Sequence, residues 1–588
     1  MNALLIFTIG PVQSFIAQAR KTQDLYAGSY ILSHLCRTAA RRARDGYGAE
    51  IIYPAIDNPS LPNRLVAHLT VKNREELREI GSSLEKEVRG EFIQMGLEVV
   101  RGFALPVTTA LEEQLRDFLE VYWAADEYEV DRYAECYRRL ESYLGAIKNT
   151  RIFSAGGEQG RKCSITGVYN ALFYRGQKRA FLQQAVKVPE TLEKKYLALG
   201  EALSGIGFMK RAAARYFQRR QEDFSDDFPS TAAIALAAAL PLLPADKVAR
   251  YKEIFGSDFV PQFFYEENLT PKRFEADGIP LEKLAPAKAL LNEIYAAARQ
   301  RGVVLSRYYS LVFMDGDNMG EWVAGKYLAA AEQLPDFQRN FTRLLGAYAG
   351  QIQAAMAPEK RGRLVYCGGD DLLGFINLNY LTTVLRELRQ QFPPLEQFTG
   401  AGGRKVATTS AGVCIAHYKI PLIEVNNMAR KMESNAKSID GKDTLAIGVL
   451  KHSGETCQAV FKWHYEDLDT LALLQRLIAY LAGGEFSDTF IRNLGREFGL
   501  KTVQEEKEKR NKMPELQATE EEMVKAEINR LLQRSCQLSD RQEAKAKIKG
   551  LGEQLFTLYV EAGLVDFLSF LDIAAFLSRE VQVNENQD

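Results

Sequence analysis

The amino-acid sequence predicts an α+β protein made of two similar mixed domains and two helical domains. Short apolar runs typical of strands alternate with helical spacing in residues 1–125 and again in residues 301–455. Residues 126–300 and 456–588 are instead mainly helical and charged. The length of 588 residues is too great for one hydrophobic core and suits about three to five domains. These four ranges are therefore the expected domains.

The first mixed domain is predicted to run strand, helix, two strands, helix and strand. Its strands are expected at Ala3–Ile9, Glu50–Tyr53 and Leu65–Thr70, with a last one near Val121–Trp123, and its helices at Val12–Arg44 and Arg74–Met95. The 126–300 region that follows contains no repeats and reads as helical.

The second mixed domain is predicted as β-α-β-β-α-β over residues 303–450, which is the ferredoxin-like layout. Its strands are expected at Tyr308–Met314, Arg363–Cys367, Leu372–Leu378, Thr409–His417 and Thr444–Leu450, and its later helices at Tyr380–Phe392 and Pro421–Lys437. In the 456–588 region, the mixed-charge stretch Lys501–Glu527 suggests a solvated helix face or connection, and Ile548–Leu577 suggests a small bundle.

Composition sets limits on the partners and the compartment. Lys and Arg number 75 against 76 Asp and Glu, so no global field attracts nucleic acid, and RNA contacts would need local patches or partner subunits. Seven cysteines without regular spacing favour a reducing compartment. The longest apolar run, residues 231–245, is too short to span a membrane and contains Pro241 and Pro244. We expect a soluble, cytoplasmic protein.

Acidic side chains gather at two predicted strand ends. Gly368-Gly369-Asp370-Asp371 forms the turn of the 363–378 hairpin, and Asp315 and Asp317 follow the 308–314 strand. If these strands are neighbours, the four acids converge, and such carboxylates need a counter-charge.

Mg²⁺ or Mn²⁺ would provide that counter-charge, and two ions about 3.5 to 4 Å apart catalyse nucleotidyl transfer. Gly368 and Gly369 would let a triphosphate approach the turn closely. Each motif also has a purely structural interpretation, as a hairpin turn or as a helix-capping loop.

One lysine and two serines extend this hypothesis. Lys437, near the end of the 421–437 helix, is placed to reach a triphosphate as a point charge, although a lysine there is also typical of a solvated helix end. In the first mixed domain, Tyr53-Pro54 through Arg64 stands where the second has its acidic hairpin, so this half is expected to hold the acceptor nucleotide. Ser14, at a helix start after Gly10-Pro11, is a candidate contact, as is Ser29.

These motifs resemble the palm of diguanylate cyclases and, more closely, the large subunit of type III CRISPR effector complexes of the Cmr type. The matching segments are Ile9-Gly-Pro-Val-Gln-Ser-Phe-Ile16, Arg20–Ser33, Pro62-Asn-Arg64, Phe228-Pro-Ser-Thr231, Ser410-Ala-Gly-Val413 and His417–Leu422, with Asp315, the Gly-Gly-Asp-Asp hairpin and Ala436-Lys437. They occur in order over about three quarters of the chain.

The resemblance implies two palm domains and a nucleotidyltransferase that binds ATP between them. Asp315, Asp370 and Asp371 would hold two metals, Asp317 would contact the nucleotide, and Lys437 would lie near the donor triphosphate. The implied product is a cyclic oligoadenylate made when a complex of Cmr-type subunits and guide RNA has captured target RNA. The residues leave open an S-adenosylmethionine-AMP conjugate as product, a non-catalytic scaffold subunit, and a free-standing dinucleotide cyclase or polymerase.

The chain departs from the family pattern at two places. The family commonly has a zinc knuckle of paired cysteines, but Cys163-Ser-Ile-Thr-Gly167 keeps one cysteine, and structural zinc needs four ligands, so no zinc is expected. The family also commonly carries an N-terminal His-Asp nuclease domain. None of the five histidines here is followed by Asp, so we expect that nuclease to be absent. The helical 456–588 region would contact small partner subunits.

Overall fold

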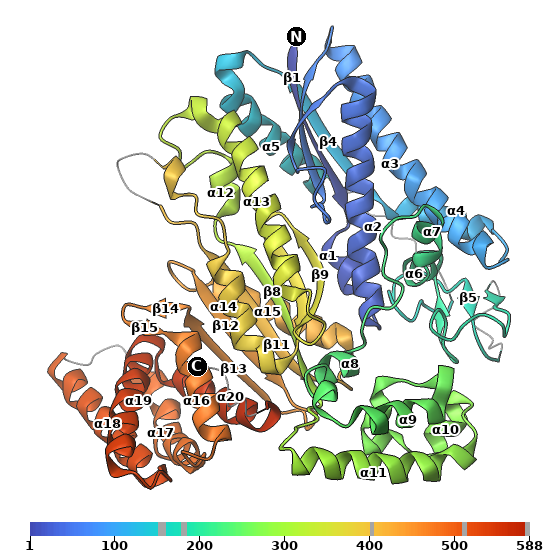
Figure 1. Cartoon of the computed structure of the whole chain (residues 1–588). Helices are drawn as coiled ribbons and strands as arrows, with labels where there is room; N and C mark the ends of the chain where they lie inside the picture. Colours follow the sequence, from blue (N-terminus) through green and yellow to red (C-terminus); the bar gives the residue numbers. More distant parts are fainter. Residues whose placement is uncertain (151–159, 178–184, 400–404, 509–513, 583–588) are drawn as a thin grey trace.

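The computed structural model describes residues 1–150, 160–177, 185–399, 405–508 and 514–582. Figure 1 shows one palm domain at the top and a second in the middle, with helical groups beside and below them. This arrangement confirms the predicted α+β class. Within the described residues, none of the helices is both long and apolar enough to cross a membrane.

The first palm is a four-stranded sheet in the order β2-β3-β1-β4, with every neighbouring pair antiparallel. Its strands are β1 (Asn2–Gly10), β2 (Glu50–Tyr53), β3 (Arg64–Thr70) and β4 (Glu120–Glu127). Its helices are α1 (Gln13–Ala17), α2 (Thr22–Arg41), α3 (Arg74–Gly102) and α4 (Thr109–Phe118). This strand order is the ferredoxin-like one, as predicted.

The second palm has six strands in the order β13-β12-β11-β8-β10-β9. The strands are β8 (Tyr308–Gly316), β9 (Gly362–Gly368), β10 (Asp371–Ile376), β11 (Thr409–His417), β12 (Thr444–Leu450) and β13 (Thr456–Lys462), and the helices are α12 (Met319–Val323), α13 (Leu334–Met356), α14 (Leu381–Gln390) and α15 (Leu422–Lys437). The β9-β10-β8-β11 part repeats the first palm. Helix α15 crosses over to β12, which pairs in parallel with β11, as the predicted strand Thr444–Leu450. The sixth strand, β13, pairs with β12 and was not predicted from the sequence.

The predicted single helix Val12–Arg44 was wrong, because the chain breaks between α1 and α2. The buried ammonium of Lys210 donates hydrogen bonds to the carbonyls of Phe15, Ile16 and Gln18. These carbonyls therefore have hydrogen-bond partners without the next turn of a helix. The Asp24 carboxylate accepts the N–H groups of Arg20 and Lys21 at 3.0 Å and so starts α2.

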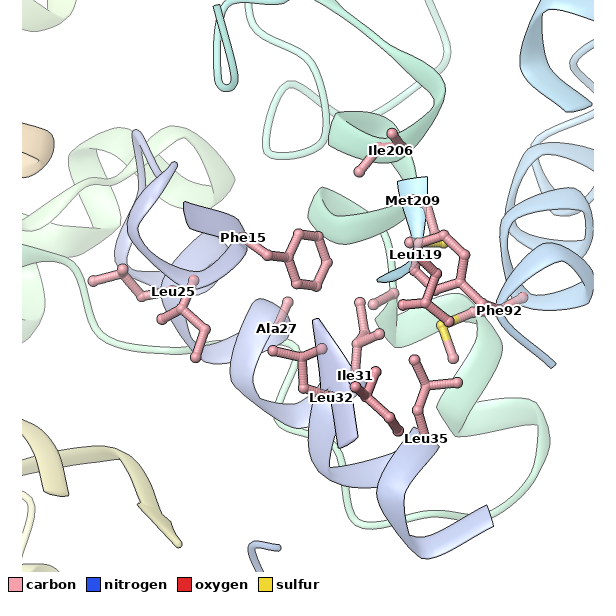
Figure 2. Packing of buried hydrophobic residues seen from close by; sticks show 14 of the residues in the cluster. Phe15, Leu25, Ala27, Ile31, Leu32, Leu35, Phe92, Leu119, Ile206 and Met209 are labelled. Atoms are coloured by element: carbon pink, nitrogen blue, oxygen red, sulfur yellow. The ribbon is translucent and has the colours of Figure 1, made fainter. Parts of the chain in front are cut away.

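The 126–300 region is mostly helical, but it also contains a small sheet that the sequence did not predict. The helices are α5 (Tyr133–Asn149), α6 (Gly205–Arg211), α7 (Ala214–Arg219), α8 (Thr231–Leu236), α9 (Ala245–Phe255), α10 (Pro271–Asp277) and α11 (Leu284–Gln300). The sheet has the order β6-β5-β7, from β5 (Phe173–Tyr174), β6 (Val186–Lys187) and β7 (Ala202–Leu203). Figure 2 shows Ile206 and Met209 of α6 packed against Phe15, Phe92 and Ile31 of the first palm.

The two palms contact each other reciprocally. Strand β2 of the first palm packs on α13 of the second, and strand β9 of the second packs on α2 of the first. Since β2 and β9 are equivalent strands, as are helices α2 and α13, the interface has an approximate twofold character. Thr342 on α13 donates a buried hydrogen bond of 2.9 Å to the carbonyl of Ile52, and Arg339 pairs with Glu50 at 2.7 Å.

The chain ends in a helical bundle against the second palm. After the short strands β14 (His464–Tyr465) and β15 (Leu468–Asp469) come α16 (Thr470–Ala482), α17 (Thr489–Glu508), α18 (Pro514–Ser535), α19 (Arg541–Ala562) and α20 (Leu564–Glu580). Helix α20 packs on β13, where Phe570 lies edge-on to Phe461 with ring centroids 5.4 Å apart. The fifth and sixth strands thus extend the palm toward the bundle.

Candidate metal and nucleotide site

Three of the four predicted acids meet at one edge of the second palm. Asp315 lies near the end of β8, Asp370 in the hairpin turn and Asp371 at the start of β10. Each offers a carboxylate oxygen, and these oxygens lie within 4.8 Å of one another. The register explains this, because Met314 pairs with Leu372 and the next residues along β8 and back along β10 are Asp315 and Asp371.

The surrounding protein disfavours the ionised form of the carboxyl groups in this cluster. Burial, and then the like charge of Asp371, raise the pKa of Asp370 to about 8. Asp371 keeps contact with solvent, yet the surrounding protein still raises the pKa of its carboxyl to about 6, against the lowering effect of Arg430. An all-oxygen donor set with mutual repulsion fits a hard divalent cation such as Mg²⁺ or Mn²⁺.

Asp317 does not join this cluster. Its carboxylate is only 2% exposed and accepts hydrogen bonds from Thr408 at 2.8 Å, from Ser410 at 2.9 and 3.1 Å, and from the backbone N–H of Asp443 at 3.1 Å. These bonds tie the end of β8 to β11 and to the start of β12. The expected convergence of four acids, with Asp317 on the nucleotide, is therefore corrected to three, and Asp317 has a structural position.

Helix α15 adds two cations and one acid beside the cluster. Lys437 forms an ion pair with Asp315 and lies 3.5 Å from Glu433. The guanidinium of Arg430 lies 4.5 Å from the Phe313 ring centroid and makes no hydrogen bond or ion pair within the part of the chain that the structure describes. Because residues 430, 433 and 437 follow at helical spacing, they share one face of α15.

Burial dominates the ionisation of this helix face. Burial, and then the neighbouring Lys442 ammonium, lower the pKa of Lys437 to about 8, while its ion pair with Asp315 acts in the opposite direction. Burial, followed by the charge of Asp371, raises the pKa of Glu433. The face therefore presents cations held close to carboxylates in a poorly solvated region, which suits a triphosphate.

Two tyrosines restrict the residues that can occupy the turn at Gly368 and Gly369. A Cβ on Gly368 would collide with the ring and hydroxyl of Tyr366, whose hydroxyl donates to the Gly368 carbonyl at 2.9 Å. Gly369 has a φ of +77°, and a Cβ there would lie 2.7 Å from the hydroxyl oxygen of Tyr53. The two tyrosines therefore require glycine at both positions, and the close approach of a triphosphate to the turn stays a prediction.

Neither predicted serine touches the acidic cluster. Ser14 is exposed in the first turn of α1, a helix of only five residues. Ser29 lies on the packed face of α2 with 2% of its surface exposed. Cys163, the remaining cysteine of the supposed knuckle, is buried, and a Cβ on Gly207 of α6 would lie 2.9 Å from its sulfur. The absence of zinc stays a prediction.

Four residues at the site escaped the sequence analysis: Tyr53, Tyr366, Arg430 and Glu433. The last two had a usable signal, because they precede Lys437 by seven and four positions on the same predicted helix face. Tyr53 had none, since its position depends on how the two palms dock. Burial, followed by the charges of Asp370 and Asp371, raises the pKa of Tyr53 well above its ordinary value.

Comparisons with known proteins agree with this architecture. A family model described as the second palm domain of Cas10/Cmr2 matches residues 308–446, and one described as the N-terminal part of the CRISPR-associated protein Cmr2 matches residues 4–97. A curated relative, the CRISPR system Cmr subunit Cmr2 of Pyrococcus furiosus, is 25% identical over 567 residues, covering 78% of this chain. The chain spans 63% of the length of that relative.

Solved structures share the fold. A chain of the type III-B Cmr-beta complex in the apo state has a TM-score of 0.62 and 14% identity, covering 92% of this chain and 78% of that one. A chain of Cmr-beta bound to cognate target RNA has a TM-score of 0.61 and 14% identity, covering 98% and 83%. This chain is thus similar to Cas10/Cmr2 proteins in both palms, and it shares the fold of the Cmr-beta chains.

Proposed function

We propose that this chain is the nucleotidyltransferase subunit of a cytoplasmic, RNA-guided Cmr-type complex, and that it converts ATP into cyclic oligoadenylates when target RNA is bound. The observation that carries the proposal is the cluster of Asp315, Asp370 and Asp371 with Arg430 and Lys437 beside it. Carboxylates for divalent cations and adjacent cations for a triphosphate are the two requirements of nucleotidyl transfer.

In this mechanism Asp315, Asp370 and Asp371 hold Mg²⁺ or Mn²⁺. Bound metal supplies activation of the attacking hydroxyl and charge compensation for the leaving group. Arg430 and Lys437 bind the triphosphate, because Arg430 has free donors and Lys437 already lies against Asp315. The 3′-oxygen of one nucleotide bonds to the α-phosphorus of the other, the bond to the β-phosphate breaks, pyrophosphate leaves, and the hydroxyl proton passes to water.

The proposed partners follow from the relatives. The curated relative is named as a Cmr subunit, and one of the similar structures is a Cmr-beta complex bound to cognate target RNA. We infer that this chain assembles with other Cmr-type subunits and meets guide and target RNA mainly within that complex. The nearly balanced charge of the chain supports this, because it offers no general attraction for RNA.

The test is mass spectrometry of products after the assembled complex is incubated with ATP and Mg²⁺ or Mn²⁺, with and without matching target RNA. Adenylate oligomers formed only with target RNA are the expected result. The double variant Asp370→Ala with Asp371→Ala should form no product and still assemble.

Intact ATP in every condition would contradict the proposal. Repeating the incubation with S-adenosylmethionine separates a changed acceptor from a true scaffold, because only the former gives an adenylylated product. A failure of the double variant to assemble would show that the hairpin is mainly structural.

A further inference from the structure

Tyr53 is the point at which the first palm reaches the acidic turn of the second. It is the last residue of β2, and its hydroxyl oxygen lies 2.7 Å from the position that a Cβ on Gly369 would take. Asp370 and Asp371 are the next two residues of the chain, and their charges act on the Tyr53 hydroxyl. It comes from a domain that contributes no carboxylate to the cluster.

The backbone around Tyr53 is fixed by the interface between the palms. The carbonyl of Ile52 accepts the 2.9 Å hydrogen bond from Thr342 of α13, and Glu50 pairs with Arg339 of the same helix. The Tyr53 side chain packs against a hydrophobic cluster that contains residues of both palms. Its position is therefore set by buried contacts on both sides, and the side chain is only partly exposed.

The hydroxyl itself has no hydrogen-bond partner among the residues that the structure describes. Tyr366 on the other side of the same turn differs, because its hydroxyl donates to the Gly368 carbonyl at 2.9 Å. One tyrosine hydroxyl thus supports the turn, whereas the other remains free to donate. A phenol is protonated at neutral pH and readily donates to an anionic oxygen.

We propose that Tyr53 is a nucleotide-contacting residue supplied by the first palm, whose hydroxyl donates a hydrogen bond to an oxygen of the nucleoside triphosphate bound at Asp315, Asp370 and Asp371. This inference rests on the proposed function and assigns the first palm a direct part in binding. It also makes the site complete only when β2 is docked on α13.

The decisive variant is Tyr53→Phe in the full chain, which keeps the packed ring and removes the free hydroxyl. The affinity for a non-reactive α,β-methylene ATP analogue with Mg²⁺ is measured by titration calorimetry, together with kcat and KM for product formation in the assembled complex. Loss of one hydrogen bond to a charged group should weaken binding by about 10-fold or more. The melting temperature and the stabilisation by Mn²⁺ alone should match the wild type.

Two other tyrosine variants serve as controls. Tyr309→Phe removes a buried hydroxyl of the second palm that has no hydrogen-bond partner among the described residues, so nucleotide binding should be unchanged. Tyr366→Phe removes the hydrogen bond to Gly368 and should lower the melting temperature. Tyr309→Phe thus controls for the loss of a tyrosine hydroxyl in general, and Tyr366→Phe controls for loosening of the turn. Neither variant removes the proposed contact with the nucleotide.

Equal analogue affinity and equal kinetics in Tyr53→Phe and the wild type would overturn the inference. The inference would also be overturned if Tyr53→Phe lost analogue binding and the Mn²⁺ response and had a lower melting temperature, because that pattern indicates that the hydroxyl stabilises the fold. If the wild type itself neither binds the analogue nor forms product, the proposed function fails, and the inference falls with it. If the wild type binds the analogue and forms product, and Tyr53→Phe does so equally well, only the proposed role of Tyr53 is refuted.

Discussion

The two palms share one strand order but differ in the connection between their second and third strands. In the second palm, β9 and β10 are joined by Gly369 and Asp370, a turn tight enough to hold three carboxylate oxygens within 4.8 Å of one another. In the first palm, β2 and β3 are joined by the 54–63 loop, and the side chain of Asn58 from that loop packs against Gly346 of the second palm.

This difference assigns the two halves separate tasks. A short connection concentrates like charges, which is useful only when a cation is to be bound. A long connection next to the edge strand instead makes contacts with the neighbouring domain, and Arg37 supports it by donating to the carbonyls of Asn58 and Pro59. The same four strands thus provide a charged turn in one palm and a docking edge in the other.

The largest expected effect comes from neutralising one acid in each connection. Asp370→Asn should reduce product formation by about 100-fold or more and remove most of the melting-temperature increase caused by Mn²⁺, because the proposed metal site loses one charged ligand. Asp57→Asn, in the exposed loop of the first palm, should leave both unchanged. Thermal melts with increasing Mn²⁺ and product assays compare the two, and an equal response would mean that the connections do not differ in metal binding.

A smaller effect is expected from adding one methyl group to a glycine in each half. Gly369→Ala must adopt a φ of +77° and approach the Tyr53 hydroxyl, so the hairpin should be destabilised by about 1–3 kcal/mol. Gly90→Ala, in α3 of the first palm with nothing within 4 Å of the new methyl, should stabilise by about 0.5–1 kcal/mol. Hydrogen–deuterium exchange of β9, β10 and α3 measures both, and unchanged exchange in the hairpin would contradict the tight packing of its turn.

The smallest expected effect is an opposite response of the two palms to pH. His34 on α2 is buried, which lowers the pKa of its imidazole, but hydrogen bonds to Glu222 at 3.2 Å and Glu91 at 2.7 Å raise it overall above 6.5. A raised pKa stabilises the fold below the ordinary value, and this contribution is lost as the pH rises through the folded-state value. Burial, and then His452, lower the pKa of His417 to about 4, so β11 loses stability as the pH falls below 6.5.

Hydrogen–deuterium exchange at acidic and mildly alkaline pH, corrected for intrinsic exchange rates, measures this difference. The α2–α3 contact should be better protected at the acidic end, and the end of β11 at the alkaline end. In His34→Gln the pH dependence of the first palm should disappear, whereas that of the second should persist. If both palms respond in the same direction in the wild type, the assignment of the two imidazoles is wrong.

Local pattern was enough to predict most of the second palm. The predicted strands Thr409–His417 and Thr444–Leu450 coincide with β11 and β12, because buried strands are continuous apolar runs with clear boundaries. The cluster of Asp315 with the hairpin acids followed from the assumption that their strands are neighbours, and the register of β8 with β10 confirms that assumption.

The predictions that were wrong or missing depend on contacts between residues far apart in the sequence, or on segments too short to show a pattern. Residues 18–21 contain no Gly or Pro, and the break there depends on Lys210, which is distant in the sequence. Asp317 resembles its neighbour Asp315 in sequence, but only the packing of β11 shows that Ser410 and Thr408 satisfy it. The strands β5, β6 and β7 have two residues each, too few to show a periodic pattern.

The lysine that ends α1 also limits how this protein can be shortened. Lys210 belongs to the helical region between the palms, yet its ammonium satisfies three backbone carbonyls of the first palm, and its neighbour Arg211 forms a buried ion pair with Asp24. A shortened protein made of the two palms alone would leave those carbonyls without the ammonium, and the buried Asp24 carboxylate would lose its counter-charge. The interior of the first palm is thus completed by residues of the helical region, which follow it in the sequence.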